Sequence, residues 1–184
     1  MAAGMSTPLK PNRPSSTDAC VTDIASVLTT WCPDLCVATP CGVLAPLLGR
    51  LQEQHSGFRY VHREDNAVAL AVGTALAGGR GAVLMQNSGF GQSVNVLASL
   101  VEPFDVPLGL VVSMRGTGVD GTRENRGMGR VTIPVLEHLG LPWRMLGGDD
   151  QHSAVAWFET MLADRAGPAA LLVPPEAFGW SAAQ

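Results

Sequence analysis

Residues 62–100 read HREDNAVALAVGTALAGGRGAVLMQNSGFGQSVNVLASL, and this stretch is the strongest indicator of the fold. Its acidic residue Glu64 opens a helix rich in Ala and Gly that is expected over 64–77. The apolar run 81–86 then reads as a buried strand, and a turn containing glycine leads into a second helix, expected over 91–101. A helix, a buried strand and another helix in this order predict a parallel sheet that is covered by helices.

The same alternation runs through the rest of the chain. Apolar runs typical of strands lie at 35–39, 58–62, 81–86, 107–113, 142–146 and 169–173. Helical patterns lie at 18–32, 42–54, 64–77, 91–101, 130–139 and 151–165. We therefore predict an α/β fold of three layers (α/β/α) with a six-stranded, mostly parallel sheet, formed by one domain over residues 17–184. Residues 1–16, rich in Pro, Ser and Thr, are expected to form a flexible tail.

The residues most typical of a binding site follow the predicted strands. They are Thr39-Pro40-Cys41-Gly42, Arg63-Glu64-Asp65-Asn66, Asn87-Ser88-Gly89 and Arg115-Gly116-Thr117-Gly118. Open α/β sheets bind ligands at this edge. The segment 116–129 lacks an apolar period and is expected to be a mobile loop.

The glycine turn after residue 86 has a second interpretation as a dinucleotide phosphate loop. The GxGxxG pattern is incomplete, because Val94 stands where the third glycine is required. A Rossmann-like nucleotide-binding module therefore stays only as an alternative.

Composition excludes several classes of protein. The net charge is −4 and Lys and Arg form no cluster, which argues against nucleic-acid binding. No apolar run reaches the roughly 18 residues of a membrane span, and the N-terminal sequence lacks the apolar segment of a signal peptide, so a cytoplasmic protein is expected. With 46% hydrophobic and only 15% charged residues, the surface is expected to support association with other subunits.

The four cysteines are expected to be reduced thiols. Cys32 and Cys36 have a CxxxC spacing that is compatible with a metal site. No histidine lies near them in the sequence, and Cys36 opens a predicted buried strand, where a thiol behaves as a small hydrophobe. No metal ligands are therefore expected in this chain.

The RED before the small-residue helix and the MQNSGFG after the strand resemble the pyrimidine-binding domain of thiamine-diphosphate decarboxylases, most closely phosphonopyruvate and sulfopyruvate decarboxylases. The resemblance continues through PLGLVVSMRG (107–116) to MGR (128–130) and covers roughly residues 36–146. It implies the pyrimidine-domain fold, thiamine diphosphate as cofactor and Glu64 as the catalytic residue. A carboxyl group in this role shares a proton with N1′ of the pyrimidine ring and thereby activates the cofactor.

The resemblance also implies the other site residues. Those expected at the cofactor, besides Glu64, are Pro40, Cys41, Gly42, Gln86, Asn87, Ser88 and Gly89. Those expected at an anionic substrate are Asn87, Ser88, Arg115 and His62, with Arg123 and Arg126 behind them. Arginine suits a phosphonate or sulfonate because its N–H groups form paired hydrogen bonds with oxyanions.

The second half of such a site has no counterpart in this sequence. Enzymes of this class hold the diphosphate and Mg²⁺ with a GDG run followed by an asparagine, and this chain has no GDG. Its nearest run, Gly147–Asp150, is expected to be a turn and a helix cap. We therefore expect a hetero-oligomer in which a β subunit supplies the GDG domain and Mg²⁺.

The activity expected of this assembly is decarboxylation of a small anionic 2-oxo acid, of the sulfopyruvate or phosphonopyruvate type, to an aldehyde and CO₂. Two alternatives stay open: a thiamine-diphosphate-dependent carboligase, and a non-catalytic partner with the same fold.

Overall fold

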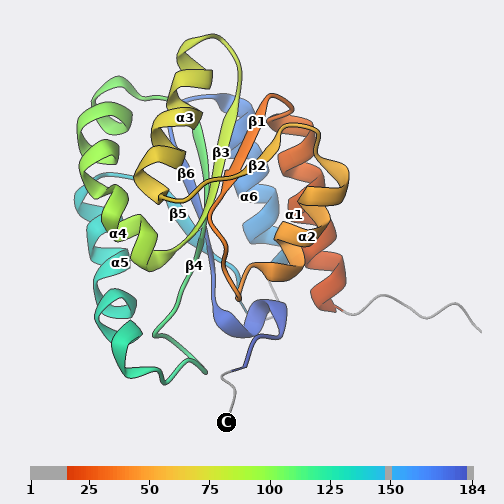
Figure 1. Cartoon of the computed structure of the whole chain (residues 1–184), viewed down its shortest axis with the longest axis vertical. Helices are drawn as coiled ribbons and strands as arrows, with labels where there is room; N and C mark the ends of the chain where they lie inside the picture. The colour runs from red at the N-terminus through yellow and green to blue at the C-terminus, as the bar shows by residue number, and fades with distance from the viewer. Residues whose placement is uncertain (1–15, 148–150, 182–184) are drawn as a thin grey trace, which may run out of the picture.

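A computed structural model describes residues 16–147 and 151–181 of the chain. Its centre is a sheet of six strands, all parallel, in the order β2-β1-β3-β4-β6-β5. The strands are β1 (Leu35–Ala38), β2 (Phe58–Tyr60), β3 (Gly81–Gln86), β4 (Leu108–Ser113), β5 (Trp143–Met145) and β6 (Ala169–Val173). The predicted three-layer α/β/α fold is confirmed, and the sheet is fully parallel (Figure 1).

Helices connect the strands. They are α1 (Ser16–Trp31), α2 (Ala45–Gln54), α3 (Glu64–Leu76), α4 (Asn87–Val96), α5 (Arg126–His138) and α6 (Gln151–Asp164). Shorter helical segments are η1 (Leu97–Val101), η2 (Glu102–Phe104), η3 (Arg123–Asn125) and η5 (Pro175–Phe178). Among the described residues, no helix combines the length and the apolar character that crossing a membrane requires.

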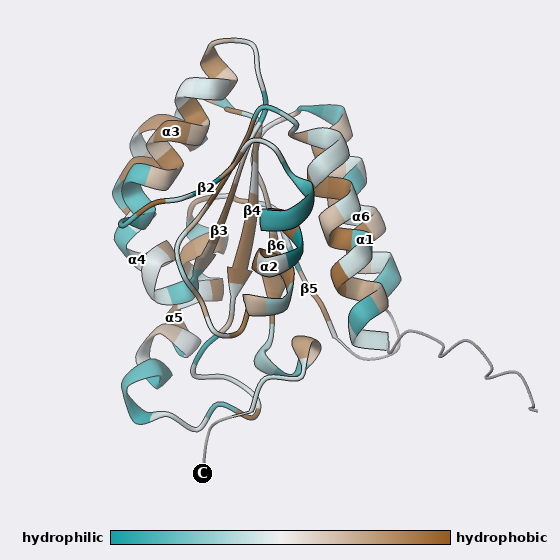
Figure 2. Ribbon diagram, turned by 45° about the vertical axis from the view of Figure 1, so that its right-hand side comes forward, coloured by the Kyte–Doolittle hydropathy of each residue, from teal (hydrophilic) through white to brown (hydrophobic). Residues whose placement is uncertain are grey.

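The helices cover both faces of the sheet. Helices α1, α2 and α6 pack on one face, and α3, α4 and α5 pack on the other (Figure 1). Successive strand residues alternate between the two cores, so Cys36 and Ala38 face α1 while Val37 faces α3. Burial on both faces explains why the strands are apolar along their whole length, as Figure 2 shows for β3 and β4.

The strand order places a topological switch point between β1 and β3. After β1 the chain crosses through α2 to β2 on one side, and it then returns through α3 to β3 on the other side of β1. The helices that follow β1 and β3, α2 and α4, therefore pack on opposite faces of the sheet. Ligands of open α/β sheets bind at such a switch point.

Two predicted boundaries are wrong in a way that matters for the site. Helix α4 begins at Asn87 rather than at residue 91, so the glycine turn forms the first turn of the helix. Helix α5 begins at Arg126 rather than at residue 130. The predicted tail, apart from Ser16, and the predicted cap at 148–150 lie outside the described residues.

Candidate active site

Glu64 stands at the switch point as the first residue of α3, directly after the turn that follows β2. Its side chain is half-buried, and within the described part of the chain its carboxylate has no hydrogen bond and no ion pair. The carboxyl group packs against Gly89, where even a methyl group would overlap the Cγ, Cδ and Oε1 atoms of Glu64. The first turns of α3 and α4 therefore meet through a glycine and an unpaired carboxylate.

The first turn of α4 contributes the amide and hydroxyl groups expected from the sequence. The Gln86 side chain donates a hydrogen bond to Ser88 Oγ at 2.7 Å. The Asn87 side chain is fully buried, and its Nδ2 donates to the Arg115 carbonyl at 2.9 Å. This bond fixes the Asn87 amide and links the ends of β3 and β4.

Two buried oxygen atoms at this edge lack hydrogen-bond partners. They are Asn87 Oδ1 and the Thr39 hydroxyl oxygen, which follows β1. An unpaired buried polar atom costs free energy, typically about 1–3 kcal/mol, unless a ligand or water completes it. Both atoms lie where the switch point predicts a ligand, and we interpret them as groups that pair with a bound molecule.

The turn after β1 borders a hollow between α2 and the end of β2. Pro40, Cys41 and Gly42 line it together with Tyr60 at the end of β2, and its volume is about 420 Å³. The Cys41 thiol is buried and lies 3.1 Å from the hydroxyl of Ser113, the last residue of β4. This contact ties the β1 turn to the centre of the sheet.

Arg115, the predicted anion-binding residue, forms a buried ion pair. Its Nε lies 2.5 Å from Oδ2 of Asp120, whose side chain is completely buried. The backbone N–H groups of Gly116 and Thr122 and the Thr122 hydroxyl also donate to Asp120. Burial by itself would raise the pKa of Asp120, but the hydrogen bonds from Arg115, Thr122 and Gly116 outweigh burial and hold this pKa well below its usual range.

The Asp120 network shows that the segment 116–129 is not the mobile loop expected from its sequence. It contains η3 and the start of α5, and its backbone segments approach each other closely at two glycines. A side chain at Gly116 would overlap the Asn125 carbonyl, and one at Gly129 would overlap the Gly116 carbonyl. The segment lacks an apolar period because a buried carboxylate, rather than an apolar core, organises it.

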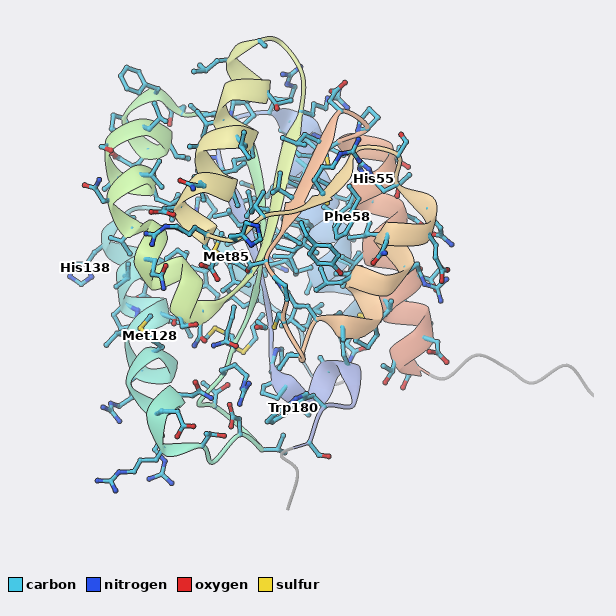
Figure 3. The ribbon with its side chains drawn as sticks, viewed as in Figure 1. His55, Phe58, Met85, Met128, His138 and Trp180 are labelled. Carbon is cyan, nitrogen blue, oxygen red and sulfur yellow. The ribbon has the colours of Figure 1, made fainter. Side chains whose placement is uncertain are left out.

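Trp180 comes from the C-terminal part of the chain to cover Arg115. The guanidinium carbon lies 4.4 Å from the centre of the indole ring, a cation–π contact. A side chain at Gly42 would lie 3.7 Å from Trp180 Nε1, so the ring also covers the β1 turn. Figure 3 shows Trp180 at the carboxyl end of the sheet, away from His55 at the other end.

The other residues predicted at the substrate, His62, Arg123 and Arg126, are exposed at the surface. His62 is exposed after β2 and has no hydrogen bond in the described structure. Arg126 is exposed and donates to the Gly121 carbonyl at 3.1 Å, and Arg123 is exposed on η3. The fold thus brings Arg115 to the site as a fixed side chain and leaves the other three at the surface.

These residues fit the pyrimidine end of thiamine diphosphate. An unpaired carboxylate suits the ring nitrogen N1′, and an unpaired oxygen such as that of Thr39 or Asn87 suits the 4′-amino group as an acceptor. The absence of a side chain at Gly89 leaves space for the Glu64 carboxyl group itself.

Sequence reasoning missed two residues of this site, Asp120 and Trp180, and neither carried a local signal. Thr39 was named among the residues that follow predicted strands, but it was not assigned to the cofactor or the substrate. One premise of the argument against a metal site at Cys32 and Cys36 does not hold in the fold, because His55, 23 residues along the chain from Cys32, lies 3.9 Å from Cys32 Sγ. A hydrogen bond from Cys36 and a weaker one from His55 lower the pKa of the Cys32 thiol to about 6, although burial by itself would raise it.

Comparison with known proteins gives consistent relatives. No family model matches the sequence. It is 38% identical over 112 residues to sulfopyruvate decarboxylase subunit alpha of Methanothermobacter thermautotrophicus, covering 60% of this chain and 68% of that protein. It is 34% identical over 110 residues to the subunit of the same name from Methanocaldococcus jannaschii, covering 59% and 65%.

A third relative is longer than this chain. Phosphonopyruvate decarboxylase of Streptomyces viridochromogenes is 31% identical over 156 residues, covering 83% of this chain but only 39% of that protein. This chain thus spans well under half of the phosphonopyruvate enzyme and about two thirds of the α subunits. The resemblance seen in the sequence is confirmed, and the chain belongs to the family of sulfopyruvate decarboxylase α subunits and phosphonopyruvate decarboxylases.

Proposed function

We propose that this chain is the pyrimidine-binding α subunit of a thiamine-diphosphate-dependent decarboxylase for an anionic pyruvate derivative. The observation that carries the proposal is the carboxylate of Glu64, which is half-buried and unpaired at the switch point. The Glu64 carboxyl lies against Gly89 at the edge where the Thr39 and Asn87 oxygens are unpaired. The Glu64 carboxylate and the two nearby oxygen atoms are all hydrogen-bond acceptors that lack donors. A heterocyclic ring with N–H groups would supply those donors.

Glu64 would hold a proton at N1′ of the pyrimidine ring. The cofactor, when bound, supplies the nucleophilic carbon and the electron sink that decarboxylation of a 2-oxo acid requires. The first turn of α3 favours a negative charge on Glu64, and contact with Gly89 fixes the direction of the carboxyl group. In this role Glu64 would exchange a proton with one ring atom repeatedly, as a general acid and base must.

Arg115 is the residue that we assign to the anionic group of the substrate. Asp120 holds its Nε and Trp180 covers one face of the guanidinium, while within the described structure no hydrogen bond occupies Nη1 or Nη2. The free Nη1 and Nη2 groups of the guanidinium can therefore donate two parallel hydrogen bonds to a sulfonate or phosphonate. Because Asp120 balances the charge of Arg115, recognition of the anionic substrate group would rest on hydrogen-bond geometry rather than on net charge.

A second subunit completes the proposed enzyme. Relatives carry the name subunit alpha, which implies a partner subunit. Among the described residues, the only group of three or more possible metal ligands is Cys32, Cys36 and His55, and Mg²⁺ prefers oxygen ligands. We therefore assign Mg²⁺ and the diphosphate to a β subunit that faces Glu64.

The experiment uses the tagged chain as bait in its own host and assays the assembly that it captures. With thiamine diphosphate and Mg²⁺ present, CO₂ release is measured from sulfopyruvate, phosphonopyruvate and pyruvate. We expect release from the substrates that carry a tetrahedral oxyanion, weak release from pyruvate and none from the isolated chain. An assembly that decarboxylates none of the three, or pyruvate as efficiently as the others, would contradict the proposal.

A further inference from the structure

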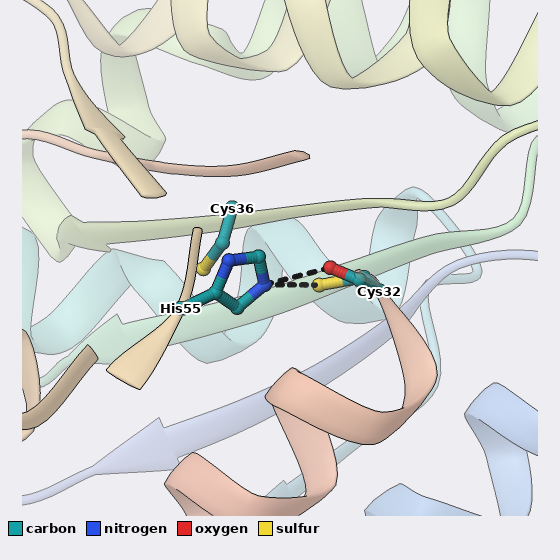
Figure 4. Close-up of side chains that lie close together, drawn as sticks. All are labelled: Cys32, Cys36 and His55. Carbon is teal, nitrogen blue, oxygen red and sulfur yellow. Dashed lines mark hydrogen bonds between the residues drawn. The ribbon is translucent and has the colours of Figure 1, made fainter. Parts of the chain in front are cut away.

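A cluster of two thiols and one imidazole lies at the amino end of the sheet, away from the candidate active site. Cys32 follows α1, Cys36 lies in β1 and His55 follows α2, and their ligand atoms all lie within 4.8 Å of one another (Figure 4). Both cysteines are fully buried and free of disulfides, and His55 is 5% exposed. The cluster is therefore closed to solvent.

Backbone hydrogen bonds fix each segment that carries these side chains. The Cys32 N–H donates to the last turn of α1 at 2.9 Å, and the His55 N–H donates to the last turn of α2 at 2.8 Å. The Cys36 N–H donates to the Gly57 carbonyl at 3.2 Å. A side chain at Gly57 would collide with the Asp34 backbone, so the loop between His55 and β2 is held in place. The ligand atoms from the ends of α1 and α2 and from β1 are thus held close together by fixed backbone segments.

We propose that Cys32, Cys36 and His55 form a structural site for a thiophilic metal ion, Zn²⁺ or Cu⁺. Thiolate sulfur and imidazole nitrogen are the ligands that these ions prefer, and the three side chains supply three of the four positions of a tetrahedral Zn²⁺ site. Two thiolates would balance the charge of Zn²⁺ completely, which lowers the cost of burying the ion. Cu⁺ accepts two or three soft ligands, so the same three side chains suit both ions.

Binding changes the protonation of the cluster in a defined way. Without metal, the Gly57 N–H donates to His55 Nδ1 at 3.1 Å, so the ring proton lies on Nε2, which donates to the Cys32 carbonyl at 2.7 Å. As the ion enters, the Cys36 proton and any proton still on Cys32 leave to solvent, and the ring proton moves from Nε2 to Nδ1. The Cys32 carbonyl and the Gly57 N–H each lose a hydrogen bond. That loss is several times smaller than the binding free energy of a structural zinc ion.

The site is independent of the proposed catalytic function. It would join the end of α1, the start of β1 and the end of α2, which line one face of the sheet. Its effect should therefore appear in stability and metal content rather than in turnover.

The test measures metal binding by the full chain under reducing conditions. Zinc and copper contents are determined by mass spectrometry after purification without chelators. The metal-free chain is then titrated with Co²⁺, Zn²⁺ or Cu⁺, both folded and during refolding, because the closed site is expected to load as it forms. We expect one ion per chain, a thiolate-to-Co²⁺ charge-transfer absorption and a higher melting temperature. The ion that is retained distinguishes zinc from copper.

Matched variants locate the site. Cys36→Ser should abolish the absorption, and His55→Gln should weaken metal binding by more than about 100-fold, beyond the effect of losing an outer-shell partner. Cys20→Ser removes another buried cysteine outside the cluster and should retain binding. A wild-type chain with no bound metal, no cobalt absorption and no thermal shift would overturn the proposal. So would a loss of metal binding in Cys20→Ser as large as that in Cys36→Ser. The wild-type measurements decide the question even where a variant fails to fold.

Discussion

Replacing Glu64 by glutamine is expected to lower the turnover of the assembled enzyme by about 10²–10⁴-fold, the usual contribution of a general acid–base residue. Glutamine has nearly the same shape and retains the contact with Gly89, so packing at the switch point should survive. Its amide cannot exchange a proton with N1′ of the pyrimidine ring. The measurement is kcat for CO₂ release at saturating cofactor and substrate.

Asp65→Asn is the matched control for this substitution. Asp65 follows Glu64 in the same helical turn, but its carboxylate pairs with Arg63 at the surface, at 2.9 Å. Surface pairs contribute little, so Asp65→Asn should leave turnover and melting temperature nearly unchanged. Equal turnover in Glu64→Gln and the wild type would exclude Glu64 as the catalytic residue.

Replacing Asp120 by asparagine is expected to destabilise the chain by about 3–5 kcal/mol, the range for breaking a buried ion pair. Arg115 would keep its charge but lose its partner, and an amide group cannot accept all the bonds from Arg115, Gly116 and Thr122. For a domain of this size the melting temperature should fall by roughly 10 °C. Thermal unfolding of both proteins, with Asp65→Asn as the control, measures the change.

The pH dependence of this difference has a definite sign. Because the pKa of Asp120 in the folded chain lies well below its usual range, its stabilising effect is complete above the unfolded pKa of about 4. The effect is lost as pH falls toward the lower, folded pKa. The gap between the wild type and Asp120→Asn should therefore be constant between about pH 5 and pH 8 and narrow below about pH 4. A gap that is absent at neutral pH would mean that Asp120 does not anchor Arg115.

The layers of the fold could be predicted because burial on both faces makes each strand apolar along its length. The runs at 81–86 and 169–173 coincide with β3 and β6, and Glu64 begins α3 as expected. The start of α4 could not be predicted, because Asn87, Ser88 and Gly89 are typical of turns. They form a helix because the fold places them at the end of a central strand.

In the candidate site, too, some residues could be predicted from the sequence and others could not. Residues next to strand ends were found, because parallel strands end at one edge of the sheet. Asp120 and Trp180 reach Arg115 through tertiary structure alone, and His55 reaches Cys32 in the same way. No local pattern reports such contacts, since they depend on where loops distant in sequence return to the sheet.

The most direct test of the central claim is a calorimetric titration of the captured assembly with thiamine diphosphate in the presence of Mg²⁺. The claim is that this chain holds only the pyrimidine end of the cofactor. It predicts one bound cofactor for each chain that carries Glu64, and no binding to the isolated chain. An assembly that binds no thiamine diphosphate, or an isolated chain that binds it as tightly as the assembly does, would contradict the claim.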